Sequence, residues 1–234
     1  MSAISRRSLV WGFACFALLF PSFAAAQNQD KKPTDKGISG SQLFSGSKIK
    51  VELAQTQIFG VKAEGTKFLY VFDRSSSMEV PKGRPMAAAK AELLASLKDL
   101  KSTHQFQVIF YNHLLSVCDA GTGPRMLWGD ERGKSTAQEF VTRMKGDGGT
   151  KHLPALITAL RLQPDVIFFL TDADDPILSL EELERVRDSN HGTAIHCIEF
   201  GSGPQKPGEN FMQRLARENG GKHAYVDTRK LGAP

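Results

Sequence analysis

The feature that most constrains the fold is a series of short apolar segments, separated by stretches with helical periodicity. The segments are nearly continuous in apolar residues and lack the apolar–polar alternation of a strand with one face in water. Strands of this kind belong to parallel sheets that are covered by helices on both faces. The five segments are 68–72, 106–111, 166–170, 195–200 and, more weakly, 223–226.

The intervening stretches predict helices. Met86, Leu93 and Leu97 form an apolar stripe at helical spacing. Ser179 and Glu182 have the spacing of a capping box, which opens a helix. Because helices alternate with buried strands, we expect a doubly wound, Rossmann-like α/β fold. The expected helices are 86–100, 135–145, 152–162, 179–190 and 209–219.

The chain of 234 residues is long enough for one domain with a sizeable core. Residues 27–47 are rich in Lys, Gly, Ser and Asp and predict a flexible linker. Residues 48–53 alternate strictly between polar and apolar, which predicts an edge strand with one wet face. We therefore place the domain at 48–234, with its core at 64–228.

The N-terminus has the pattern of a secretory signal peptide. An arginine pair, Arg6 and Arg7, precedes the apolar run 11–20, and small residues allow cleavage after Ala26. The pair suits twin-arginine (Tat) export, while the general pattern suits Sec export equally well. A retained signal that anchors the protein in a membrane is the alternative, although the run is short for a span. We expect residues 1–26 to be removed and the protein to be periplasmic or secreted.

Charge gives no sign of nucleic-acid binding. The full chain has a net charge of +5, and the predicted signal peptide contributes two arginines and no acidic residue, so the mature charge is +3. Lys and Arg are scattered along the sequence instead of clustered in one patch.

Side chains with hard oxygen donors follow the apolar segments. Asp73, Ser75 and Ser77 come directly after the first segment, and residues two apart in an extended loop point the same way. Thr150 follows a Gly-Gly pair, and Asp172 follows the segment 166–170. Carboxylates and hydroxyls are ligands for Mg²⁺ or Mn²⁺, and the lack of Cys and His in the set argues against zinc.

This ordered set resembles the metal ion-dependent adhesion site (MIDAS) of von Willebrand factor type A (vWA) domains. The strings Asp73-x-Ser75-x-Ser77, Gly-Gly-Thr150 and Leu-Thr-Asp172 fill all five signature positions. The amino-acid sequences of segments 59–65 and 170–175 are similar to those of exported bacterial members of the family.

The resemblance implies a mostly parallel six-stranded sheet of order 3-2-1-4-5-6, with a short antiparallel edge strand near 115–118. In that order the first and fourth strands are neighbours where the winding reverses, which is where open α/β sheets bind ligands. Asp73 and Asp172 end these two strands. Cys118 and Cys197 would lie far apart in this sheet, so we expect free buried thiols instead of a disulfide.

The resemblance also implies a function. Ser75, Ser77 and Thr150 would bind the ion directly, while Asp73 and Asp172 would act through metal-bound water. The ion would keep much of its charge and one open position, which an acidic side chain of a partner protein could fill. In adhesion-type relatives a helix after the last strand switches the site. Here residues 227–234 are too short for such a helix, which predicts a constitutive site.

Two other functions are open at this point. A Mg²⁺-dependent phosphoryl-transfer enzyme could use Asp73 as nucleophile, but such enzymes need an acid two residues later, where Ser75 stands. A scaffold of the same fold without bound metal is the other alternative. We expect a binding domain with no catalytic residue.

Overall fold

The computed structural model of the protein describes residues 51–119, 121, 123, 125–173 and 176–232, which belong to one compact unit. The predicted signal peptide (1–26) and linker (27–47) lie outside these residues and stay predictions. The helices are α1 (Arg84–Lys98), α2 (Glu131–Arg143), α3 (His152–Leu160), α4 (Leu180–Ser189) and α5 (Phe211–Glu218), with 3-10 turns η1 (Ser76–Glu79) and η2 (Thr228–Lys230).

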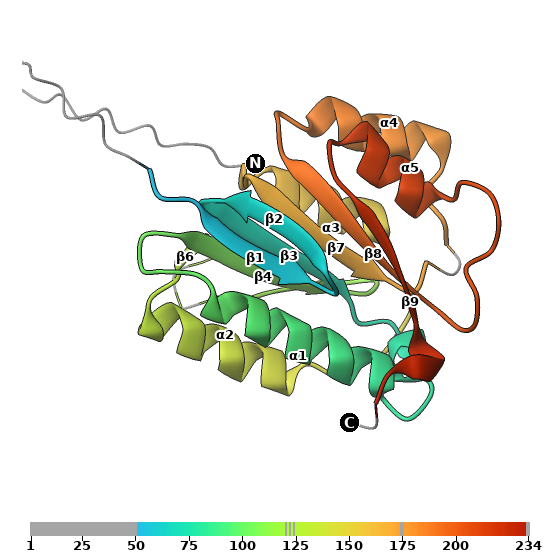
Figure 1. The fold of residues 1–234 in the computed structure, drawn as a ribbon, viewed down its shortest axis with the longest axis horizontal. Coiled ribbons are helices and arrows are strands. Elements are labelled where there is room, and N and C mark those ends of the chain that lie inside the picture. Colours follow the sequence, from blue (N-terminus) through green and yellow to red (C-terminus); the bar gives the residue numbers. More distant parts are fainter. Residues whose placement is uncertain (1–50, 120, 122, 124, 174–175, 233–234) are drawn as a thin grey trace, which may run out of the picture. The chain divides into compact units, whose positions relative to one another are not determined.

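In the described part of the chain the strands form a seven-stranded sheet and a separate hairpin (Figure 1). The order β5-β4-β3-β7-β8-β9 confirms the predicted order 3-2-1-4-5-6. β5 is antiparallel to β4, as expected, and so is the two-residue strand β6, which the sequence did not reveal. The sheet strands are β3 (Lys67–Asp73), β4 (Gln105–Tyr111), β5 (Leu115–Val117), β6 (Leu127–Trp128), β7 (Val166–Thr171), β8 (Ala194–Gly201) and β9 (His223–Asp227).

Helices cover both faces of the sheet, as predicted for a doubly wound fold (Figure 1). Alternate side chains of the central strand β3 enter different apolar clusters. Phe68, Tyr70 and Phe72 pack with residues of α1 and α2, whereas Leu69 and Val71 pack with residues of α3, α4 and α5. Because β3 is buried on both faces, its sequence is apolar at every position from 68 to 72.

The expected edge strand at 48–53 is wrong for the residues that the structure describes. Residues 51–53 form no strand, and the strand β1 (Ala54–Ile58) pairs instead with β2 (Val61–Gly65). The two-residue turn between them has positive φ at Phe59 (47°) and Gly60 (78°), the geometry that matches the twist of a hairpin.

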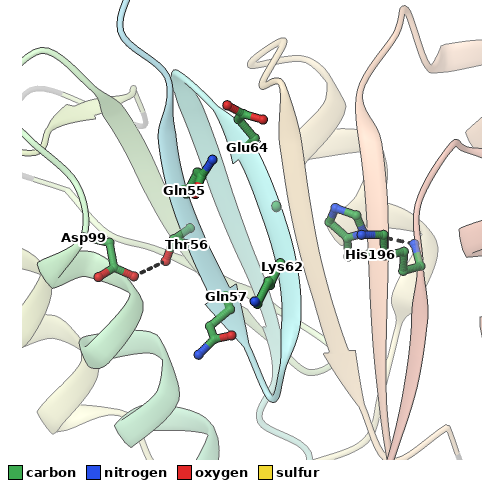
Figure 2. A pocket seen from close by; sticks show the side chains of 9 residues that line it. Gln55, Thr56, Gln57, Lys62, Glu64, Asp99 and His196 are labelled. Carbon is green, nitrogen blue, oxygen red and sulfur yellow. Dashed lines mark hydrogen bonds between the residues drawn. The ribbon is translucent and has the colours of Figure 1, made fainter.

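The hairpin packs over the sheet on the α1 side, where its inward residues join the apolar cluster of α1 and α2. Thr56 donates to the Asp99 carboxylate at 2.9 Å, and the Phe59 amide donates to Glu92 of α1 at 2.7 Å. Figure 2 shows the polar hollow along this hairpin, with the Thr56–Asp99 bond at its wall.

Cys118 and Cys197 are both free and buried, as predicted. The capping box of α4 is also confirmed, since the Ser179 side chain accepts from the Glu182 amide and Glu182 accepts from the Ser179 amide. After β9 the described chain forms only the short turn η2.

The end of α5 generates a prediction about stability. The Gly221 amide donates to the Ala216 carbonyl, which closes the helix in a Schellman motif, and a Cβ on Gly221 would lie 1.8 Å from the Ile195 carbonyl oxygen. We expect Gly221→Ala to lower the free energy of unfolding by about 2 kcal/mol or more, as overpacking does. Gly232→Ala, where a Cβ meets no atom within 4 Å, is the control. Equal urea midpoints for the two variants would contradict this close approach.

Candidate metal-binding site

The Asp73 side chain lies at the carboxyl end of β3 and has no solvent-exposed surface. Its Oδ1 accepts a hydrogen bond from the Ser75 amide at 2.7 Å, and its Oδ2 accepts one from the Thr171 hydroxyl at 2.7 Å. Burial raises the pKa of this carboxyl to about 6, although both hydrogen bonds oppose the rise and the nearby Asp172 adds to it. A carboxylate in this position is costly without a positive charge beside it.

The hydroxyls of Ser75 and Ser77 lie 2.9 Å apart, next to Asp73. The sequence suggested an extended loop, but the loop is not extended throughout. Ser75 is extended, but the turn η1 begins at Ser76, held by a bond from the Met78 amide to the Ser75 carbonyl. The Met78 side chain is fully buried and anchors this turn in the core. The turn still leaves the two predicted hydroxyls in contact.

Thr150 lies in a loop that is fastened to the Asp73 segment. The Asp147 amide donates to the Arg74 carbonyl at 2.8 Å, and the Ser76 amide donates to the Gly148 carbonyl at 3.0 Å. Gly148 has a φ of 68°, and a Cβ there would lie 2.6 Å from the His113 ring. The loop therefore needs glycine at position 148, two residues before the predicted ligand, whereas a Cβ on Gly149 would meet no atom within 4 Å.

Asp172 follows β7, the neighbour of β3, and is half-buried. It lines the same groove as Ser77, and its charge is close enough to raise the pKa of Asp73. The next residue, Ala173, has a φ of 55°, a conformation that is uncommon without glycine. Four of the five predicted residues are thus joined by hydrogen bonds or by a shared groove, and the loop bonds bring Thr150 to the same edge.

Comparison with known proteins gives matches at the level of structure. No family model matches the chain, and no curated protein sequence matches it. A von Willebrand factor type A protein from Catenulispora acidiphila has 21% identity and a TM-score of 0.58, with 76% of this chain and 46% of that chain covered. This chain therefore spans less than half of that protein.

Two further solved structures are similar. BatB, a conserved hypothetical protein from Bacteroides thetaiotaomicron, has 14% identity and a TM-score of 0.53 over 70% of this chain and 91% of that one. Proximal thread matrix protein 1 of the mussel byssus, with a zinc-occupied MIDAS motif, has 16% identity and a TM-score of 0.50 over 70% and 42%. The chain has the vWA fold.

The donor set of this vWA fold is compatible with a small divalent cation. An octahedral Mg²⁺ ion has ligands at about 2.0–2.1 Å, so neighbouring ligands lie about 2.9 Å apart. The hydroxyls of Ser75 and Ser77 already have this separation. Among the described residues there is no cluster of three or more His, Cys, Asp or Glu side chains that could hold a metal ion. A cation at this edge would therefore depend on the hydroxyls.

Sequence reasoning missed the residues that fasten the loops of this vWA fold. The Arg74 guanidinium pairs with the Asp147 carboxylate, and the buried Asn112 donates to both the carbonyl and the carboxylate of Asp147 at 2.8 Å. Asn112 also accepts from the Lys151 amide, on the other side of Thr150. The sequence signal that could have pointed to Asn112 was its position alone, because Asn112 follows β4 at the same edge of the sheet.

His152 does not line the rim of the site. It is the first residue of α3, as predicted, and it is buried against Phe169 and Phe211. Burial lowers the pKa of its imidazole to about 4, and its Nδ1 lies 2.9 Å from the Tyr111 hydroxyl. It is a packed, neutral core residue.

The raised pKa of Asp73 generates a prediction for the metal-free vWA fold. A raised folded-state pKa favours the protonated form, so wild-type protein in EDTA loses stability as the pH rises from below 3.8 through about 6. Asp73→Asn removes this loss. We expect the stability of the variant relative to wild type to increase by about 2 kcal/mol between pH 4 and pH 7.5.

Urea unfolding in EDTA at the two pH values measures this difference. Because both proteins keep the buried histidines, the effects of His152 and His196 cancel in the comparison. A constant difference between the two proteins across this range would mean that Asp73 ionises without cost.

Proposed function

We propose that this vWA domain binds a divalent cation, Mg²⁺ or Mn²⁺, through five side chains and uses the bound ion to capture an acidic side chain of a partner protein. The observation that carries this proposal is the contact of two serine hydroxyls beside a buried carboxylate. The five residues are Asp73, Ser75, Ser77, Thr150 and Asp172.

The chemistry of the donors supports an ion that remains electron-poor. Three of the proposed ligands are neutral hydroxyls, and both oxygens of Asp73 are already engaged by hydrogen bonds within the protein. Asp73 and Asp172 would therefore hold metal-bound water and not the ion itself. The ion would supply a strong positive charge at the surface, which an outside carboxylate could reach.

The choice of ion follows from the ligand type. All five donors are oxygens, which suit Mg²⁺ and Mn²⁺ better than zinc. The similar motif of the mussel thread protein, however, is described as zinc-occupied. A titration of this chain should therefore compare Mg²⁺, Mn²⁺ and Zn²⁺ directly.

The surroundings of the site support a protein partner. Large apolar side chains are strongly exposed in the segments that follow β3, β4 and β7, the strands that end at this edge; three lie in loops and one is the first residue of α4. They are Val80, Leu114, Ile177 and Leu180, each at least 60% exposed. Val80 lines the same groove as Ser77 and Asp172, and exposed apolar side chains beside a polar centre are typical of a protein-binding surface.

We also propose that the protein is exported, to the periplasm or beyond, by a signal peptide at residues 1–26. The support is the sequence pattern alone. Within the described part of the chain, no helix is long and apolar enough to cross a membrane. Gel mobility of the mature protein, with N-terminal sequencing, would show whether cleavage follows Ala26.

The geometry disfavours the enzyme alternative. A nucleophilic Asp73 would have to reach a phosphoryl group, yet its carboxylate has no exposed surface and both of its oxygens accept hydrogen bonds. The residue two positions later is Ser75, which cannot serve as the general acid. The scaffold alternative is distinguished by metal titration.

The proposed ligands give a matched pair of variants. Ser75→Ala removes a proposed ligand, whereas Ser76→Ala removes an exposed hydroxyl from the same loop. In calorimetric titration with Mg²⁺ or Mn²⁺, we expect wild type and Ser76→Ala to bind alike and Ser75→Ala to bind at least about tenfold more weakly. Wild-type protein that gives no binding heat and no shift in melting temperature with any of these ions would favour the scaffold.

A further inference from the structure

A groove with a volume of about 670 Å³ continues from the proposed metal site along the protein surface. Ser77 and Asp172 lie in its wall, so the groove and the site share residues. The loop between β8 and α5 also lines it and contributes Lys206. The volume is within the range of about 300–1,000 Å³ found for pockets that hold ligands.

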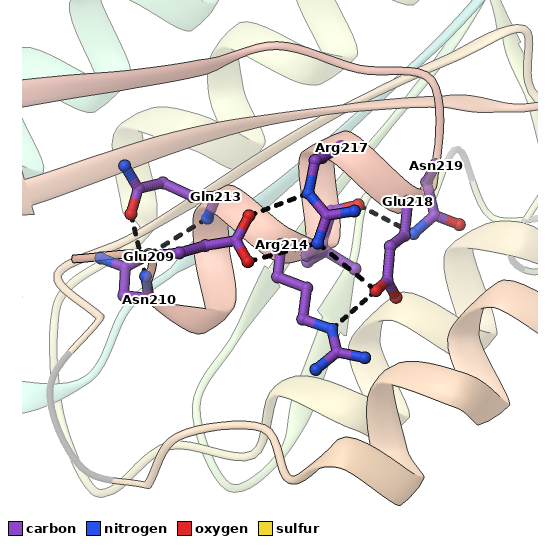
Figure 3. A network of polar contacts seen from close by, with 8 residues as sticks. Glu209, Asn210, Gln213, Arg214, Arg217, Glu218 and Asn219 are labelled. Carbon is purple, nitrogen blue, oxygen red and sulfur yellow. Dashed lines mark hydrogen bonds and ion pairs between the residues drawn. The ribbon is translucent and has the colours of Figure 1, made fainter.

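Besides Asp172, which belongs to the proposed metal site, the acidic side chains that line the groove are Glu199 and Glu209, and both are engaged within the protein. Glu199 lies 2.7 Å from the His223 ring and accepts from the Asn210 amide group at 2.7 Å. Glu209 accepts two hydrogen bonds from the Arg217 guanidinium, at 2.9 and 3.2 Å. This pair is drawn in Figure 3. Neither carboxylate presents an unpaired charge to an incoming partner.

The positive side chains of the groove differ from each other. Arg229 pairs with Asp227 through two bonds, at 3.0 and 3.1 Å. Lys206 is exposed and forms no ion pair with any residue that the structure describes. The charge of Lys206 helps to lower the pKa of Glu199 but forms no ion pair with it, so the positive side chain of the groove that is without an ion pair is Lys206.

Apolar and proline residues also line the groove. Val80 is 66% exposed, and Pro81 and Pro85 lie beside it. Pro204 and Pro207, on either side of Lys206 in the sequence, also line the groove. Because proline restricts the backbone, these two segments of the lining are partly pre-organised, which lowers the entropic cost of binding an extended segment.

We propose that the groove receives an extended acidic segment of the partner protein, with one carboxylate at the cation and a second carboxylate at Lys206. An apolar residue between the two acids packs on Val80 and Pro81. This inference rests on the proposed function, since it needs the cation at Ser77 and Asp172. It adds that the partner is recognised through two acids, one bound by a cation and the other by Lys206.

A positional-scanning library of synthetic hexapeptides, with acidic, basic and apolar residues varied at each position, tests this proposal. The purified protein is immobilised and probed in Mn²⁺ and, separately, in EDTA. We expect Mn²⁺-dependent enrichment of peptides with two acids separated by an apolar residue. The peptides that the Lys206→Glu variant selects should keep the first acid and have Lys or Arg in place of the second. The Lys206→Gln variant should bind the best wild-type peptide about two- to fivefold more weakly.

Lys98→Glu is the matched control. Lys98 is an exposed lysine at the last residue of α1, about 20 Å along the helix axis from the groove residue Pro85. We expect this variant to select the same peptides as wild type. Circular dichroism of each variant checks that the fold is kept.

The outcomes separate this inference from the function on which it rests. Suppose that the protein selects, in Mn²⁺, peptides with only one acid, and that the Lys206→Glu variant selects the same peptides as wild type. This result would overturn the two-acid inference and leave the proposed function standing. Peptide binding that is absent, or that is unchanged by EDTA, would overturn both.

Discussion

The burial of one carboxylate, that of Asp73, is the constraint on which the site depends. The side chain stands at the end of the central strand, and its two oxygens hold the Ser75 amide on one side and the Thr171 hydroxyl on the other. These bonds fix the start of the serine loop and join the end of β3 to that of β7. They only partly offset the cost of burial, because the pKa stays raised at about 6. A cation beside this group would stabilise its charged form.

Sheet topology explains why the other oxygens meet at this place. β3 and β7 are neighbours, and the chain leaves them toward opposite faces of the sheet, so their loops diverge and leave a crevice. The loop that carries Thr150 comes from a third part of the chain. It is held at the crevice by the Arg74–Asp147 pair and by Asn112, which are interactions between loops and not within the core.

Much of this arrangement could be predicted from the sequence, because burial on both faces leaves continuous apolar runs and the oxygen donors follow them directly. The β1–β2 hairpin could not be predicted in the same way. Its turn, Phe59-Gly60, is not a strong hairpin signal, and its anchoring contacts with Glu92 and Asp99 are distant in sequence. The turn η1 was missed because the burial of Met78, which draws the loop inward, depends on tertiary packing.

The most direct test of the account is a crystal of the protein soaked in Mn²⁺ and measured for anomalous scattering. The account predicts one strong anomalous peak between the hydroxyls of Ser75, Ser77 and Thr150, at metal–oxygen distances of about 2.2 Å. It also predicts that Asp73 and Asp172 face the ion through ordered water. A map without a peak at saturating Mn²⁺, or with its peak at another place on the protein, would contradict the claim that these oxygens form a metal site.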